Sequence, residues 1–393
     1  MPSSDVGERR LAGGRRLSLG AAALGLLGLA LTAAGAWVSP RQAAFSWLAG
    51  FGFALTLALG ALVFLLIQHA TGATWSIVLR RPIEAAAGTL PLLALLFVPL
   101  LFALDDLYPW AGTGAGTAAI PEDVRQGYLN APLFIVRAAI CFALWIAVPA
   151  TLRRWSRLQA ADARLTRRSR ALGAVALPPV AFTMTFAAID WFMSLEAGWV
   201  STVFGVYIFA GSILGFLALL AVAARLLDRG GALGGLLTPS HHHALGKLIL
   251  TFLIFWAYIA FVQYLLIWIA DIPAEAVWYV KRTRGGWAAL AVVLVLGHFA
   301  LPFFLLLSRT LKRRPTALAA VGAWLLVMHY LDLYWVVVPA LHPDGVRAHP
   351  LDLAALVGAA GTTFAFGTVL LRRAPLVPTG DPRLGRSLEF FTS

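Results

Sequence analysis

Ten long hydrophobic runs divide the chain from end to end, and they constrain its fold more than any other feature of the sequence. Each run has about 20 residues or more, which at 1.5 Å per residue lets an α-helix cross a hydrocarbon layer of about 30 Å. Because a backbone in lipid must satisfy its hydrogen bonds internally, we expect these runs to be helices. The predicted spans are residues 17–37, 44–69, 88–108, 131–152, 171–192, 200–225, 244–270, 286–308, 316–338 and 351–371.

Composition indicates that the membrane part is nearly the whole chain. Hydrophobic residues make up 60% of the sequence and charged residues only 12%, and the mean hydropathy is +0.81. These values are typical of a polytopic membrane protein rather than of a soluble domain with an anchor. We therefore predict an all-α protein with an N-terminal tail at residues 1–16, a ten-helix transmembrane domain at 17–372 and a C-terminal tail at 373–393.

The distribution of positive charge predicts the orientation of the chain. With alternating spans, 24 of the 31 Lys and Arg residues fall on the side that holds both termini, and six fall on the opposite side. The remaining one, Arg137, lies within a span. This bias predicts cytoplasmic termini. It also accounts for the net charge of +13 without a nucleic-acid partner.

Several charged and titratable residues lie inside spans or at their outer ends, where they are costly in lipid and therefore suggest a site. In the predicted topology these outer candidates are Asp105, Asp106, Arg137, Asp190, His298, His329 and Asp332. Carboxylates and imidazoles exchange protons near neutral pH, so the set could form a proton path or a pocket for a quinone head group. The other interpretation is a buried ion pair that only fixes helix packing. Arg137 would then pair with Asp190 or with an Asp of the 105–106 pair.

A second polar group is expected near the inner side of the membrane. His69 and Glu84 are its titratable members, and Tyr258 or Gln263 could link it to His298. We regard these four residues as candidates for an inner proton path. The C-terminal tail shows little periodicity, which predicts that it wraps a neighbouring subunit or is mobile.

Resident redox cofactors and metals are not expected. Cys141 is the only cysteine, which excludes cysteine-ligated iron–sulfur clusters and CxxCH haem attachment. His298 and His329 lack a recurring spacing that would favour a haem pair, and no further ligand pattern supports a metal site at residues 241–243.

The order of several strings resembles the NrfD/polysulfide-reductase membrane-subunit superfamily. More closely, they resemble the ActF-type membrane subunit of alternative complex III, a quinol:cytochrome c (or other periplasmic acceptor) oxidoreductase. The resemblance extends over roughly residues 45–375. It rests on LIQHATGATWSIVLRRPIEAAAGTLPLLALLF (65–97), IDWFMSLEAGWVSTVFGVYIFAG (189–211), LGKLILTFLIFWAYIAFVQYLLIWIADIPAEAVWY (245–279), GHFALPFFLLLSR (297–309) and DLYWVVVP (332–339).

The resemblance implies two four-helix bundles with the first and last helices outside them, in the bacterial inner membrane. It implies a subunit without its own redox cofactor that supports proton conduction and binds menaquinol or ubiquinol if it binds a quinone at all. The implied partners are a paralogous NrfD-like membrane subunit, an iron–sulfur/molybdopterin-like subunit and haem c subunits, which would hold the iron–sulfur clusters and haem c. A purely structural scaffold is the main alternative. A stand-alone secondary transporter is another, since prolines at 178, 179 and 302 could break helices.

Overall fold

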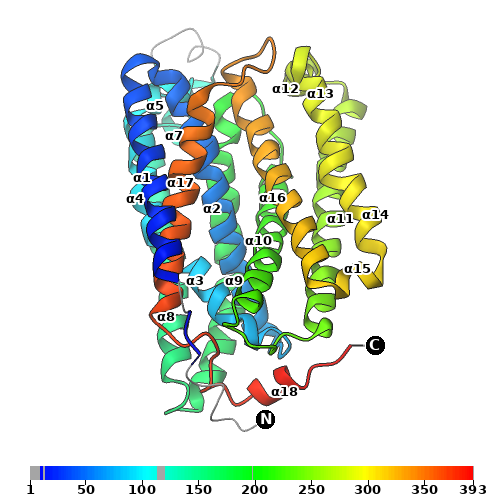
Figure 1. The fold of residues 1–393 in the computed structure, drawn as a ribbon. Helices are drawn as coiled ribbons and strands as arrows, with labels where there is room; N and C mark the ends of the chain where they lie inside the picture. Colours follow the sequence, from blue (N-terminus) through cyan, green and yellow to red (C-terminus); the bar gives the residue numbers. More distant parts are fainter. Residues whose placement is uncertain (1–8, 12–13, 113–119, 197, 393) are drawn as a thin grey trace.

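The computed structural model describes residues 9–11, 14–112, 120–196 and 198–392, and all regular secondary structure in these ranges is helical (Figure 1). Its membrane-length elements form ten spans that are long and apolar enough to cross a membrane, which confirms the prediction of a multi-pass membrane protein. The helices are α1 (Gly14–Val38), α2 (Pro40–Thr71), η1 (Ile77–Leu79), α3 (Arg80–Ala87), α4 (Leu90–Phe102), α5 (Leu104–Leu107), α7 (Glu122–Gly127), α8 (Ala131–Leu158), α9 (Arg164–Trp191), η2 (Met193–Glu196), α10 (Phe204–Arg229), α11 (Pro239–Ala270), α12 (Pro273–Arg282), α13 (Gly285–Val293), η3 (Leu294–Ala300), α14 (Leu301–Leu307), α15 (Arg309–Arg313), α16 (Pro315–Val337), η4 (Val338–Ala340), α17 (Pro350–Arg372) and α18 (Leu384–Leu388).

The spans pack in two groups around the contact between α2 and α10. In one group α2, α4, α8 and α9 contact each other in a ring. In the other, α10, α11, α16 and the segment α13–η3–α14 do the same. The pair α1 and α17 packs along the first group, against α2 (Figure 1). The α2–α10 contact is very close, because a Cβ added at Gly60 would lie 2.0 Å from the carbonyl oxygen of Ser212.

The third span differs from its predicted bounds of 88–108. It begins at Ile77, continues through η1, α3 and α4, and ends at Phe102. The sequence Arg80-Arg81-Pro82-Ile83-Glu84 has the hydropathy of a loop, yet every one of these residues is buried. Helix forms there because Arg81 pairs with Glu84 and Arg80 pairs with Asp381 from the C-terminal tail. The predicted bounds leave Arg80 and Arg81 between the second and third spans, whereas the structure buries them within the third.

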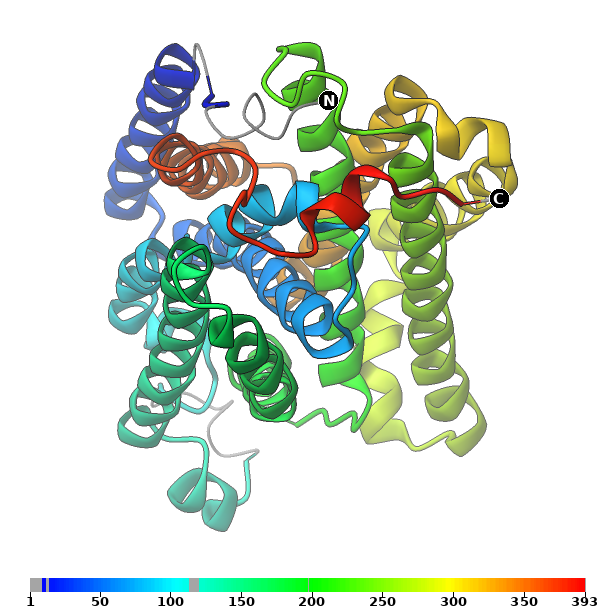
Figure 2. The same ribbon diagram turned by 90° about the horizontal axis from the view of Figure 1, so that it is seen from below.

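The C-terminal tail packs on its own chain. Seen from the end where both termini lie, it crosses the helix ends and carries α18 over the middle of the protein (Figure 2). Leu376, Val377, Asp381 and Ser387 are buried. The Ser387 hydroxyl donates to the carbonyl of Trp75, and the backbone N–H of Val78 donates to that hydroxyl. The expectation of a tail that is mobile or wraps a neighbouring subunit is corrected accordingly.

The basic connection between the fourth and fifth spans is mostly helical. We predicted a loop over residues 153–170, but α8 continues to Leu158 and α9 begins at Arg164. Both helices thus extend beyond the length needed to cross a membrane, and they carry their arginines at the shared end.

Candidate functional site

A cavity of about 670 Å³ lies in the second group of helices, between α10, α11, α12, α16 and the α13–η3 segment. Most of its wall is apolar, and polar groups come from Tyr207, Asp332, Arg282 and Gln263. Several lining side chains are also exposed on the surface of the protein, among them Tyr258 at 60%. The cavity therefore opens sideways, at the depth of the spans, rather than at an end of the molecule.

Asp332 provides a buried carboxylate at the inner wall of this cavity. It is 3% exposed on α16, and the hydroxyl of Tyr207 on α10 donates a hydrogen bond to its Oδ1. No Lys or Arg among the described residues forms an ion pair with it. A carboxyl group in this setting can hold or release a proton without breaking a salt bridge.

Two histidines extend the polar cluster behind Trp256, which lines the cavity. The His298 ring lies against Trp256, tilted by 35° and with 4.0 Å between centroids, and its two nitrogens have no hydrogen-bond partner among the described residues. His329 lies on α16 near one turn from Asp332, and its Nε2 is 2.9 Å from the Thr56 hydroxyl of α2. Buried polar nitrogens without partners mark a place where water or a ligand can bind.

A π-helical segment gives His298 its place in the interior. η3 has the N–H of Leu301 bonded to the carbonyl of Leu296, five residues back. Pro302 follows, and it lacks the N–H that would bond to the carbonyl of His298 in an α-helix. The sequence therefore favours a wider turn here, and such turns are frequent at functional sites.

A charged cluster around Arg282 closes the cavity at the end where α12 lies. The sequence did not indicate that these charges are buried. Arg282 is 1% exposed although we predicted a loop charge. Its guanidinium bonds to Glu196 at 3.1 Å, donates to the carbonyls of Trp278, Trp335 and Val336, and lies 3.5 Å from the centroid of the Trp278 ring. Burial lowers the pKa of Arg282 to about 10, against the opposing effect of Glu196, so the side chain remains a cation at neutral pH.

Gln263 and Tyr258 do not belong to the inner group in which we placed them. The amide of Gln263 donates to the Tyr279 hydroxyl of α12 at 3.2 Å and accepts from the Ser201 hydroxyl at 3.0 Å. Burial raises the pKa of Tyr279 to about 12, so that hydroxyl stays protonated. Tyr258 lies at the cavity mouth. Both residues are therefore part of the cavity wall, because α11 carries them toward α12 rather than toward α3.

The outer candidates separate into different places. Arg137 of α8 and Asp190 of α9 form a two-point ion pair in the first group of helices, with N–O distances of 2.7 and 3.1 Å. This is one of the two pairings that we considered. Asp105 is exposed on α5, and Asp106 lines a separate apolar groove with α1, α2 and α4. The structure thus brings together Asp332, His298 and His329, but not all seven residues.

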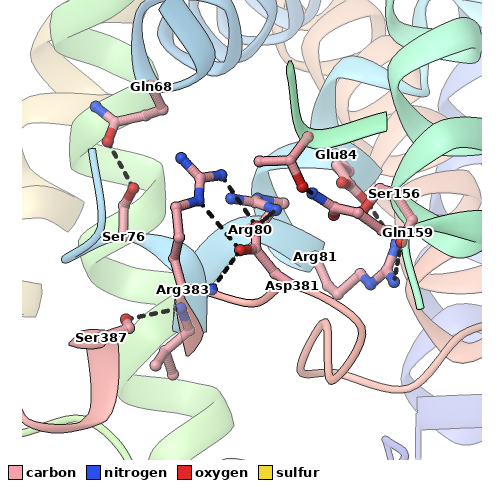
Figure 3. Close-up of polar contacts among 12 residues, drawn as sticks. Gln68, Ser76, Arg80, Arg81, Glu84, Ser156, Gln159, Asp381, Arg383 and Ser387 are labelled. Atoms are coloured by element: carbon pink, nitrogen blue, oxygen red, sulfur yellow. Dashed lines mark hydrogen bonds and ion pairs between the residues drawn. The ribbon is translucent and has the colours of Figure 1, made fainter. Parts of the chain in front are cut away.

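The inner group lies under the C-terminal tail (Figure 3). Arg80 and Arg383 both bond to Asp381, and Arg81 bonds to Glu84 at 2.8 Å. Burial favours the neutral acid of Asp381, but the hydrogen bonds from Arg383 and the charge of Arg80 outweigh it and lower the pKa of Asp381 to about 2. Among the described residues, polar atoms without a hydrogen-bond partner include His69 Nε2, Arg81 Nε, Glu84 Oε1, Ser156 Oγ and Gln159 Oε1.

The described side chains do not connect the inner group with the cavity. Thr56 and His69 are 13 residues apart on α2, which is about 20 Å along the helix axis. The buried α2 residues between them are apolar, including Leu59, Leu62 and Leu66. Any proton transfer between the two groups would need water in this interval.

A further buried carboxylate, Asp352, was not identified from the sequence. Its Oδ1 accepts from Ser46 at 2.5 Å and from Gln42 at 3.2 Å, and its Oδ2 accepts from Tyr334 at 3.1 Å. These bonds hold the start of α17 against α2 and α16. From the sequence, Asp352 is an ordinary acidic residue in the first turn of a helix that begins with Pro350. Its partners on α2 and α16 are too far away in the sequence to be predicted.

The fold and the cavity define a multi-pass, all-helical membrane protein with a laterally open amphipathic cavity. Within the described ranges, no three His, Cys, Asp or Glu side chains converge on a position for a metal ion. No protein-family model matches the chain, and no curated protein sequence does so either.

Proposed function

We propose that this protein is an integral membrane subunit of a quinol:cytochrome c (or other periplasmic acceptor) oxidoreductase, and that the cavity beside Asp332 receives the quinol head group. The observation that carries the proposal is the combination of a lipid-facing opening with a buried carboxylic acid at the inner wall. A quinol reaches a protein through the hydrocarbon layer, so its site must open sideways. Its oxidation then requires proton acceptors near the ring.

The residues of the cavity have roles that fit this substrate class. Oxidation of a quinol releases two protons and two electrons. Asp332 is placed to take a proton, with Tyr207 as the hydrogen-bond donor that positions its carboxylate. His298 and His329 lie behind Trp256 and can receive the second proton through water. The electrons leave to redox groups in partner subunits.

The remaining parts of the proposal concern the setting of the subunit. We place the two groups of spans as two four-helix bundles flanked by α1 and α17, with both termini in the cytoplasm and the protein in the bacterial inner membrane. The resemblance of residues 45–375 and the charge distribution support this setting. The proposed partners are a paralogous NrfD-like subunit, an iron–sulfur/molybdopterin-like subunit and haem c subunits. Asp332 and the two histidines support proton movement on the outer side.

The proposal is tested by purifying the chain in a mild detergent from its native membranes. We expect haem-containing partners in the reduced-minus-oxidised spectrum, quinol:cytochrome c activity, and extractable quinone. In Ala291→Trp the indole would fill the cavity, whereas in Val292→Trp it would point to the exposed side of the same helix. Quinone content and activity should fall in the first variant and stay unchanged in the second.

Each alternative has its own outcome. A colourless protein that purifies alone would contradict the complex and favour a transporter. If both Ala291→Trp and Val292→Trp keep the partners and the activity, the protein belongs to the complex but does not hold the quinol site. It would then be a scaffold subunit.

A further inference from the structure

A second cavity, of about 320 Å³, lies on another side of the protein, between α1, α2, α3, α10, α16 and α17. Its wall is almost wholly apolar. The wall follows α10 from Phe216 to Leu227, and along this helix that is about 16 Å, or half of a hydrocarbon layer. We call this cavity the acyl slot, because its length and chemistry fit an alkyl chain that enters from one leaflet.

The acyl slot opens to the surrounding lipid and toward the end where both termini lie. Leu17, Leu226 and Phe364 line it and are also exposed. Leu11 and Leu371 line it at the end that carries the tails. Thr363 also lines the slot, and its hydroxyl oxygen is buried without a hydrogen-bond partner among the described residues.

On α1, α10, α17 and the segment before α1, arginines adjoin in sequence the residues that line this end of the slot. They are Arg9 and Arg10 beside Leu11, Arg15 and Arg16 beside Leu17, Arg225 and Arg229 beside Leu226 and Leu227, and Arg372 and Arg373 beside Leu371. None of the eight forms an ion pair with a described acidic residue. Two of them already bond within the protein, since Arg9 donates to the carbonyl of Leu233 at 2.7 Å and Arg225 donates to the hydroxyl of Thr316 at 3.0 Å. Asp228 is the acidic residue that the same stretch of α10 contributes.

We propose that the acyl slot binds an anionic phospholipid of the leaflet on the side of the termini, with one acyl chain in the slot and the phosphate among these arginines. Apolar length and positive charge are needed together for this ligand. A zwitterionic lipid would gain only the apolar contacts of its acyl chain, and free phosphate would gain only the attraction of the arginines. General loop charge explains an excess of arginine at this end of the protein, but it does not explain an apolar slot beneath that charge.

The test uses the full chain purified in mild detergent, with phosphatidylglycerol and phosphatidylcholine as probes and native mass spectrometry as the readout. We expect phosphatidylglycerol to remain bound and phosphatidylcholine to wash off. Ala223→Phe would fill the slot and abolish retention. Val222→Phe changes the neighbouring residue, which does not line the slot, and should retain the lipid.

The charge of the mouth is tested separately. The double change Arg10→Gln with Arg372→Gln should weaken phosphatidylglycerol binding roughly tenfold or more, since each basic residue near an anionic headgroup contributes about 1 kcal/mol. Arg154→Gln with Arg168→Gln removes two exposed arginines from the α8–α9 end and should have no effect. Both double variants leave the slot itself intact, so their comparison still tests the proposal if Ala223→Phe fails to fold.

Three results would overturn the proposal. They are equal retention of both lipids, equal loss in the mouth and control arginine variants, and recovery of a quinone rather than a phospholipid as the ligand that Ala223→Phe displaces. The first two results do not bear on the Asp332 cavity, whereas a quinone in the slot would give the protein a quinone site outside that cavity.

Discussion

Arg137 and Asp190 hold α8 and α9 together through a two-point ion pair, with N–O distances of 2.7 and 3.1 Å. The Arg137 guanidinium also lies 3.9 Å from the ring centroid of Tyr128 and donates to its carbonyl. Each of the three guanidinium nitrogens of this arginine therefore donates a hydrogen bond that fixes the start of α8 against the end of α9. The pair is a packing feature of the first group of helices, distant in the fold from Asp332.

Asp190→Asn is expected to destabilise the protein by about 3–5 kcal/mol, because it leaves the guanidinium largely buried without its counter-charge. Thermal unfolding in detergent measures the effect. Arg125→Gln is the matched control, since its ion pair with Glu122 is exposed and should be worth less than about 1 kcal/mol. An equal loss of stability in both variants would show that the Arg137–Asp190 pair has no special role.

Asp332→Asn is expected to lower quinol oxidation about a hundredfold while the complex still assembles, because positioned proton acceptors contribute about 10²–10⁴-fold to rates. Tyr207→Phe should lower it less, since the carboxylate remains. The measurement is turnover per co-purified haem, which separates catalysis from assembly. Asp344→Asn changes an exposed carboxylate and should turn over normally. Normal turnover in Asp332→Asn would remove this residue from the proton path.

Arg282→Gln should cost about 2–4 kcal/mol of stability, because the carbonyls of Trp335 and Val336 would lose charged donors, while Glu196 would keep only its ion pair with Lys281. Arg282→Lys should not restore it, since an ammonium group cannot reproduce the planar fork of donors. Arg284→Gln, two residues on and exposed, should stay within about 0.5 kcal/mol of the wild type. Unfolding midpoints of the three variants decide the matter, and full rescue by lysine would contradict the geometric argument.

Acid should release the C-terminal tail. The pKa of Asp381 is lowered to about 2 in the folded protein, against about 3.9 for an unfolded aspartate. The contribution of this carboxylate to stability is therefore complete above about pH 4 and is lost as the pH falls toward 2. Pepsin cleavage of the tail measures this, with each rate divided by that of Asp381→Asn at the same pH. The wild type should be protected at pH 4.5 and lose that advantage near pH 2; a ratio that does not change with pH would refute the assignment.

Gly60→Ala should separate α2 from α10 and cost about 1–3 kcal/mol, because the new methyl group would lie 2.0 Å from a backbone carbonyl that cannot rotate away. Gly20→Ala is the control, since nothing lies within 4 Å of a Cβ at that position of α1. The control should be neutral or slightly stabilising, as alanine favours helix. Equal midpoints of thermal unfolding would mean that the two spans can move apart freely.

The sequence was sufficient to predict ten spans, because the need to satisfy backbone hydrogen bonds in lipid leaves a long apolar run few choices, but the third span begins at Ile77 rather than at residue 88. It was not sufficient where a polar residue finds its partner far along the chain. Arg80 and Arg282 lie between predicted spans, and only the folded chain reveals Asp381 and Glu196 beside them. Asp352 was missed for the same reason. The candidates Asp332, His298 and His329 were found because intramembrane titratable groups are rare, but depth alone did not separate them from Arg137 and Asp190.

The pairing of α1 with α17 has a consequence for how the protein is made. The first span contacts the last more extensively than any other helix, and its glycines at 25 and 28 lie against the backbone of α17. Synthesis proceeds from the N-terminus, so α1 enters the membrane long before its partner exists. Until then its contact within the described chain is the smaller one with α2, and much of the face that α17 will cover meets lipid. The buried Thr32 hydroxyl is satisfied meanwhile, because it donates to the carbonyl of Gly28 in the same helix. The main contact of the first span thus forms only after α17 has been made, and a ribosome that stops before residue 350 would leave α1 without it.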